Sequence, residues 1–300
     1  MDREPLSHLL TRVGLSEGER HGKFLKSVVA ILRSLRATVL GLVFWLAWQA
    51  CAQTPSYRVV SVTDGGTIRG VVNWSGPVPA PVTMPISKDP DICDPHSHRR
   101  VSLDRLVVGP QGGVANTVVF LQNVSAGKAF SSSMTKPLLD QVECHYKPHI
   151  LLVPQNSDLD VRSSDQTLHT VHMEGVATYN LPFPFPNKVS TARMSAPGLV
   201  DIKCNGGHVW MNAELWVISH PYYAITDESG RFELTGVPPG KYVLVAWHEG
   251  WTVVRHQGTI DVLAQRVVQR PTFSDPRTWE QKVTVVPKGE TTVEFEISDK

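Results

Sequence analysis

The sequence has few cysteines, no excess of charge of one sign and no long apolar run outside its N-terminal region. Only 4 cysteines occur among 300 residues, and the formal net charge is +1. Lysine and arginine are not gathered into a basic stripe, which argues against nucleic acid as a partner. The chain also has no nucleophile motif, no glycine loop for phosphate and no carboxylate pair placed by a motif. These absences argue against hydrolase and nucleotide chemistry.

Glycine and proline, in contrast, are plentiful. The chain has 22 of each, and they recur at intervals typical of turns. That spacing favours many short strands over long helices. After the N-terminal region no stretch has a convincing helical period, so the sequence predicts an all-β protein. A chain of 300 residues is long enough for two domains with ordinary cores.

The N-terminal region has the pattern of a targeting segment. A basic stretch precedes the apolar run Thr38–Trp48, which is too short to span a membrane comfortably. The run is followed by Ala50-Cys51-Ala52, a small-x-small cleavage signal. We therefore expect a signal peptide over residues 1–52, cleavage near Ala52, a periplasmic or secreted protein and no membrane contact after cleavage. A retained N-terminal anchor is the alternative.

Cysteine usage follows from this expectation. Cys51 would leave with the signal, and Cys93 and Cys144 would remain as a disulfide permitted by an oxidising compartment. Cys204 is then the odd cysteine, and coordination to a metal would explain why it stays reduced. The alternatives are that Cys204 pairs with another cysteine or is a buried free thiol.

One short loop carries three different kinds of metal ligand. Residues 201–211 are predicted to form the end of a strand, a tight loop and the start of another strand, and the loop contains Cys204, His208 and Met211. A thiolate, two imidazoles and a weak axial thioether are the ligands of a blue-copper site. The second imidazole would come from an upstream strand that carries His169 and His172. The pattern therefore predicts copper as the cofactor.

The remaining sequence predicts two β-domains. Alternating runs from Gly65 onward predict short strands, and the proline-rich segment Tyr179–Pro186 cannot join a central strand. One ligand from an internal strand and three from a later strand–loop–strand match the way a Greek-key sandwich gathers distant residues. After residue 220, an Asp-Glu-Ser-Gly turn and a Pro-Pro-Gly turn separate further strands, which predicts a second, smaller antiparallel sandwich.

These motifs resemble those of known families. The segment LHTVH, with His169 in the ligand position, and the segment CNGGHVWM resemble the strand and loop motifs of the cupredoxins. The chain is similar to a bacterial exported subgroup of cupredoxin-like proteins, some of them termed methylamine utilisation proteins. In that subgroup the cupredoxin-like domain is paired with a carboxypeptidase regulatory-like (transthyretin-like) module. The segment TDESGRFELTGVPPGKYVLVAWHE resembles the signature of that module. The resemblance covers about Gly65 to Ser298.

The resemblance implies a cupredoxin-like domain over residues 53–220 and a regulatory-like domain over residues 221–300. It also implies a blue-copper site and an electron carrier, rather than an enzyme, that serves a redox partner protein. The implied ligands are His169, Cys204, His208 and Met211. The chain departs from the subgroup in having three residues, not two, between the cysteine and histidine of the loop. Thr170 also replaces the asparagine that commonly follows the strand histidine.

Two other functions stay open at this point. In one alternative the C-terminal domain contacts carbohydrate or a cell surface, and the metal site is minor or vestigial. Exposure of the aromatic residues of that domain would favour this function; they are Tyr222, Tyr223, Trp247 and Trp251. Copper storage or delivery would be favoured by additional ligands such as His96, His98 and His172. A copper enzyme would need an open coordination position, and Met211 is expected to fill it.

Overall fold

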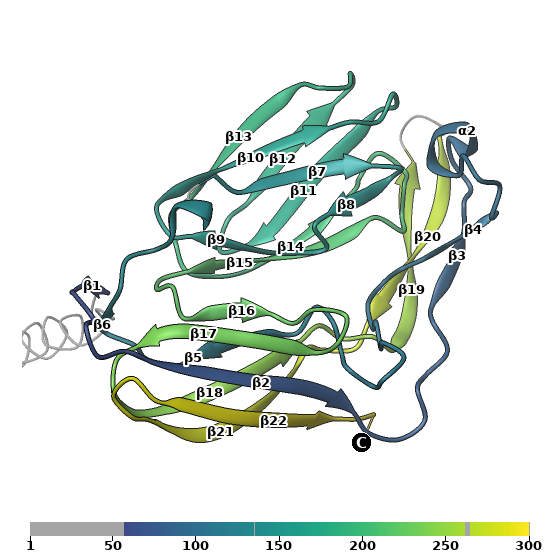
Figure 1. Ribbon diagram of the computed structural model, residues 1–300. Helices are drawn as coiled ribbons and strands as arrows, with labels where there is room; N and C mark the ends of the chain where they lie inside the picture. Colours follow the sequence, from purple (N-terminus) through teal and green to yellow (C-terminus); the bar gives the residue numbers. More distant parts are fainter. Residues whose placement is uncertain (1–56, 135, 262–264, 300) are drawn as a thin grey trace, which may run out of the picture. The chain divides into compact units, whose positions relative to one another are not determined.

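The computed structural model describes residues 57–134, 136–261 and 265–299, so the predicted signal peptide lies outside the described residues. Among these residues, the helical elements are the short α-helix α2 (Pro90–Cys93) and one 3-10 turn (Ser132–Met134). No helix in this part of the chain is long and apolar enough to cross a membrane. Strands form nearly all the regular structure, which confirms the predicted all-β class (Figure 1).

The first sandwich is built from two sheets whose inner faces form one hydrophobic core. One sheet has the order β13-β10-β7-β8 and the other the order β12-β11-β14-β15-β9. Their strands are β7 (Leu138–Val142), β8 (His145–Lys147), β9 (Ile150–Pro154), β10 (Ser157–Ser163), β11 (His169–Gly175), β12 (Tyr179–Phe183), β13 (Val189–Met194), β14 (Gly198–Lys203) and β15 (Asn212–Ile218). Alternate residues of β11, such as Val171 and Met173, are fully buried, as a half-buried strand requires.

The second sandwich combines strands from both ends of the described chain. Its sheets have the orders β16-β5-β18-β21 and β17-β2-β22. The strands are β2 (Gly66–Trp74), β5 (Val118–Leu121), β16 (Tyr223–Ile225), β17 (Arg231–Val237), β18 (Gly240–His248), β21 (Arg277–Val285) and β22 (Glu290–Ile297). Hydrogen-bonded pairing therefore crosses the division expected at residue 220, because β2 lies between β17 and β22.

Three two-stranded ribbons complete the structure. They are β1 (Arg58–Val59) with β6 (Ala126–Gly127), β3 (Thr83–Pro85) with β4 (Arg100–Ser102), and the hairpin β19 (Val253–Asp261) with β20 (Arg266–Phe273). The hairpin belongs to the second sandwich in sequence, yet it runs beside the ends of the first-sandwich strands (Figure 1). This placement brings it to the loop between β14 and β15.

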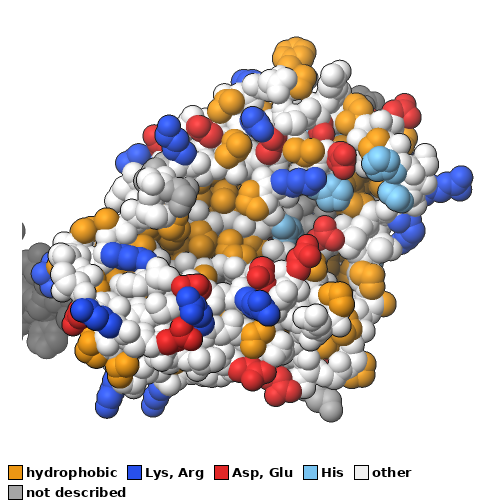
Figure 2. Space-filling view, in the orientation of Figure 1, with side chains coloured by type: hydrophobic (Ala, Val, Ile, Leu, Met, Phe, Trp, Pro, Cys, Tyr) orange, Lys and Arg blue, Asp and Glu red, His pale blue; other side chains and the backbone are white. Residues whose placement is uncertain are grey.

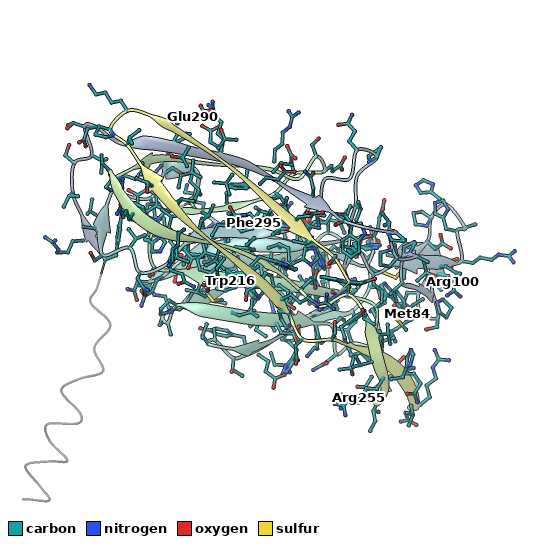
Figure 3. The ribbon with its side chains drawn as sticks, turned by 90° about the horizontal axis from the view of Figure 1, so that it is seen from below. Met84, Arg100, Trp216, Arg255, Glu290 and Phe295 are labelled. Carbon is teal, nitrogen blue, oxygen red and sulfur yellow. A yellow bond between two sulfur atoms is a disulfide. The ribbon has the colours of Figure 1, made fainter. Side chains whose placement is uncertain are left out.

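The two sandwiches share a small aromatic cluster. Phe120 of β5 stacks on Tyr223 of β16 with ring centroids 4.7 Å apart, and Trp216 of β15 contacts Phe120 at 5.4 Å. Figure 2, drawn in the orientation of Figure 1, shows hydrophobic side chains gathered in a hollow across the middle of the visible face. Figure 3 places Trp216 in the interior of the view, well away from the labelled ends of the molecule. The shared cluster gives the sandwiches a common apolar contact in addition to their separate cores.

Candidate metal centre

Sheet pairing explains how residues far apart in sequence meet at one end of the first sandwich. Strands β11 and β14 are antiparallel neighbours, with His172 opposite Lys203. The start of β11 therefore lies beside the end of β14, and this places His169 next to Cys204. The loop then returns to β15 with two backbone hydrogen bonds: the Met211 amide donates to the His208 carbonyl at 3.1 Å, and the Cys204 amide donates to the Met211 carbonyl at 3.4 Å.

The side chains of His169, Cys204 and His208 converge. Each histidine Nδ1 lies 3.9 Å from Cys204 Sγ, and the two imidazole centroids are 4.5 Å apart. All three residues are fully buried, and Cys204 is a free cysteine. An ion with bonds of about 2.3 Å to sulfur and about 2.0 Å to nitrogen spans such a gap. The thiolate and two imidazoles therefore fit a transition-metal ion in kind and in spacing.

Both imidazoles are oriented by carboxylates. His169 Nε2 lies 2.9 Å from Asp165 Oδ2, and His208 Nε2 lies 3.1 Å from Asp89 Oδ2. An Nε2–H donated to a carboxylate leaves the Nδ1 lone pair facing Cys204, which is how carboxylates fix the tautomer of ligating histidines. The arrangement presents three donor atoms toward one point.

Electrostatics favour the thiolate form of Cys204. Burial alone would raise the pKa of this thiol, but hydrogen bonds and charge from His169 and His208 outweigh burial and hold the pKa well below its ordinary value. Burial lowers the pKa of His169, whereas Asp165 and Cys204 raise it, and the balance raises it to about 9. Both shifts favour a thiolate beside a cationic imidazole while no metal is bound.

The predicted disulfide is present, and it supports both carboxylates. Cys93 and Cys144 are bonded, which confirms that pairing. The Cys93 amide donates to the Asp89 backbone carbonyl at 2.9 Å, and this fixes the turn that carries Asp89. On the other side of the bridge, the amides of Glu143 and Cys144 donate to Asp165 at 2.6 and 2.8 Å. The disulfide therefore joins the two segments that orient the histidines.

The β19–β20 hairpin covers the ligand loop. The Arg270 guanidinium donates to the Cys204 carbonyl. Gly207, with φ of 97°, lies so close to the hairpin that a Cβ there would meet the Asp261 carboxyl group at 2.7 Å. This contact and the positive φ require glycine at position 207. Lys88 in turn pairs with Asp261 at 3.2 Å.

The remaining residues considered as ligands are Met211, His172, His96 and His98. Met211 is 1% exposed and closes the loop by its two backbone hydrogen bonds. His172 lies three residues along β11 and is on the opposite face of that sheet from His169. His96 and His98 are exposed and contact each other at 5.8 Å between centroids. Thr170 accepts a hydrogen bond from the Asn205 amide at 2.7 Å, so a threonine hydroxyl braces this loop.

The aromatic residues considered for carbohydrate contact are mostly inaccessible. Tyr222, Trp247 and Trp251 are buried, and Tyr223 is partly buried under Phe120 and Trp216. An exposed aromatic platform, which a stacking contact with sugar rings would need, is therefore not formed by these four residues.

Sequence reasoning missed three residues of the site. Asp165 precedes His169 by four positions, and that spacing is the only local signal that could have found it. Asp89 and Arg270 lie in segments distant from the loop, and no local pattern marks them. Both are brought to the site by tertiary structure: Asp89 by the disulfide-linked turn, and Arg270 by the hairpin.

Together, the fold and the cluster define an all-β protein with a buried cysteine–histidine group that could hold a metal. A family model described as "Polysaccharide lyase family 4, domain II" matches residues 192–269. The match covers β14 to β19 and so includes the ligand loop. No curated protein matches this chain in sequence.

Solved structures similar to part of the chain include copper proteins. A mutant of amicyanin has 19% identity and a TM-score of 0.26, over 30% of this chain and 89% of amicyanin. A purple cupredoxin from Nitrosopumilus maritimus has 14% identity and a TM-score of 0.25, over 28% of this chain and all of its own. A Cu-containing nitrite reductase from Thermus scotoductus has 14% identity and a TM-score of 0.26, and the match spans 22% of that protein.

Proposed function

We propose that the protein is an exported copper-binding protein with a blue-copper type of site that transfers electrons to a partner protein. The observation that carries this proposal is the buried thiol of Cys204 with the Nδ1 atoms of His169 and His208 each 3.9 Å from its sulfur. Cys204, His169 and His208 would be the equatorial ligands and Met211 the weak axial ligand. Copper would supply a one-electron change between Cu(I) and Cu(II).

The residues around the ligands are arranged to keep the site rigid. Asp165 and Asp89 hold the two imidazoles, and the disulfide holds the segments that carry or contact these carboxylates. Full burial of the ligands excludes water from the site. An electron carrier requires little rearrangement between its two oxidation states, and a site fixed from several sides meets that requirement. This reasoning supports a carrier rather than a catalyst.

The remaining parts of the proposal extend the sequence argument. The N-terminal segment would direct export to the periplasm or the outside of the cell, and the second sandwich would be the transthyretin-like module that the resemblance implies. Export agrees with the disulfide, since disulfides persist in oxidising compartments.

The test is a visible spectrum of the purified protein loaded with Cu(II). We expect an intense thiolate-to-copper charge-transfer band that disappears in Cys204→Ser and is lost or strongly altered in His169→Ala. His172→Ala is the matched control, because it removes a histidine from the same strand but from the opposite face, and it should leave the band unchanged. A wild-type protein that takes up copper without the band, or a band lost only in His172→Ala, would contradict the proposed ligand set.

A further inference from the structure

A cavity of about 520 Å³ lies on the outer face of the sheet that carries the ligand loop. Its floor is formed by β11, β14 and β15, and the β19–β20 hairpin forms its roof. Two rows of side chains cross the floor, first His172, Lys203 and Asn212, then Glu174, Asp201 and Glu214. The volume is in the range of small-molecule sites. None of the four candidate copper ligands lines this cavity.

Arg270 is an unbalanced cation in the roof. Its guanidinium donates to the Cys204 carbonyl, and no carboxylate forms an ion pair with it in the part of the chain that the structure describes. Burial lowers the pKa of Arg270, while the charges of Cys204, Tyr146 and Asp201 act in the other direction. Guanidinium has five N–H donors and matches a carboxylate in a two-pronged contact. A partly buried cation that lacks such a partner is costly, so the cavity favours an anion at this end.

The floor has unmet hydrogen-bonding groups of its own. Glu214 is 5% exposed, and its Oε2 has no partner among the described residues. Its Oε1 lies 3.9 Å from the Arg105 guanidinium. The His172 Nδ1 is likewise buried without a partner in the described structure. A ligand that carries a hydrogen-bond donor would satisfy Glu214.

Three other polar groups of the floor already have partners. Lys203 forms an ion pair with Asp201, and Asn212 bonds both Arg105 and the Trp210 carbonyl. The rows that contain Lys203 and Glu214 are two residues apart along the strands, which corresponds to about 7 Å. Arg270 contacts the Cys204 carbonyl at the end of the Lys203 row, so Arg270 and Glu214 lie toward different rows of the floor.

We propose that this cavity binds a small organic acid whose carboxylate pairs with Arg270 and whose hydrogen-bond donor contacts Glu214. Hydroxy acids, including sugar acids, and amino acids share this chemistry. None of the candidate copper ligands lines the cavity, so binding of the acid does not require copper.

Isothermal titration of the full-length protein with gluconate, 4-aminobutyrate and glucose tests the proposal. We expect at least one of the two acids to bind and glucose not to bind. Arg270→Gln should weaken binding of the acid roughly ten- to hundredfold, because a charged hydrogen-bonded contact is lost. Arg255→Gln is the matched control, since Arg255 is an exposed arginine of the same hairpin at the edge of the molecule and should change nothing (Figure 3).

Glu214→Gln separates the two sources of the acid. Burial holds the pKa of Glu214 well above its ordinary value, and a bound ammonium would favour its ionised form. Glu214→Gln removes this charged partner, so binding of 4-aminobutyrate should fall about tenfold, whereas binding of gluconate through a hydroxyl should change much less. Glu214→Gln also serves as the second variant if Arg270→Gln does not fold. If Glu214→Gln then bound both acids as tightly as wild type, the proposal would be overturned. The same conclusion would follow if neither acid bound, or if binding in a folded Arg270→Gln matched wild type. The protein should bind the acid equally well with and without added Cu(II), so a failure of the copper proposal and a failure of this one are told apart.

Discussion

At the scale of single residues, the carboxylate of Asp165 acts on the ligand cluster through its hydrogen bond to His169. It accepts hydrogen bonds from His169 and from two backbone amides. Burial alone would raise the pKa of Asp165, but these hydrogen bonds lower it by a larger amount, so the pKa lies below its ordinary value. The carboxylate therefore stays ionised. An ionised partner strengthens the imidazole as a ligand. Asp165 is therefore the position at which a small change should act on copper without touching a ligand.

We predict that Asp165→Asn lowers copper affinity about 10- to 100-fold, because an amide neither orients nor polarises His169 as a carboxylate does. Competition with a chromophoric Cu(I) chelator measures the affinity, and thermal unfolding of the copper-free protein measures any loss of stability separately. Asp160→Asn is the control, since Asp160 is an exposed carboxylate on the preceding strand that bonds Thr191. Equal affinities for wild type and Asp165→Asn would show that Asp165 only stabilises the fold.

The sequence identified the residue types of the site better than their surroundings. Cys204, His208 and Met211 lie in one loop, so their spacing is visible in the sequence, and the motif around His169 favours it over His172 as a ligand. The structure brings His169 and His208 to Cys204. Asp89 and Arg270 could not be found in this way, because their contacts depend on a disulfide and on a hairpin from the other sandwich.

At the scale of elements, the Cys93–Cys144 bridge stabilises the end of the first sandwich that contains the ligands. It links α2 to the turn between β7 and β8 across a sequence separation of 51 residues. A bridge across a loop of this length restricts the unfolded chain substantially. It also fixes the turns that contact Asp89 and Asp165, so its loss should affect both stability and metal binding.

We predict that the double variant Cys93→Ala/Cys144→Ala loses about 2–5 kcal/mol of unfolding free energy. It should also bind copper less tightly, because Asp89 and Asp165 are no longer held in place. Urea unfolding with and without a thiol reductant provides the internal control: the reductant should destabilise wild type toward the variant and leave the variant unchanged. Unfolding curves of wild type and variant that coincide without reductant would contradict the assigned role.

Local patterns predicted most strands but not the way in which they pair. The turns that flank β17 and β18 were visible as Asp-Glu-Ser-Gly and Pro-Pro-Gly, and those strands form as expected. In contrast, β2 reads as an ordinary half-buried strand of the first half of the chain, and nothing in its sequence shows that it pairs with β17 and β22. Strand register and partners depend on contacts between distant segments, so a single sequence contains little information about them.

At the scale of the whole described molecule, a buried charged cluster joins the two sandwiches. His149 precedes β9 of the first sandwich, and its Nε2 pairs with Glu249, which follows β18 of the second sandwich. Arg105 also pairs with Glu249, at 2.7 Å. Glu249 is fully buried. The other charged or titratable groups that act on this pair are Asp104, Glu214 and His248.

The pair makes stability depend on pH in a definite direction. Burial lowers the pKa of His149, but Glu249 outweighs burial and raises the pKa above its ordinary 6.5. The contribution of His149 is therefore complete below pH 6.5 and is lost as the pH rises through the raised pKa. Burial raises the pKa of Glu249, but His149 and Arg105 lower it below its ordinary 4.5, so its contribution is complete above pH 4.5.

We predict that His149→Gln lowers the unfolding free energy by roughly 1–3 kcal/mol at the pH of greatest effect. The difference from wild type should be largest between pH 4.5 and 6.5 and should shrink at higher pH. Urea unfolding across this range and up to mildly alkaline pH measures it. His145→Gln is the control, because it makes the same substitution at a histidine whose ring bonds a backbone carbonyl rather than a carboxylate. A His149→Gln difference that stays constant with pH would show that the sandwiches are held together by the aromatic cluster and not by this ion pair.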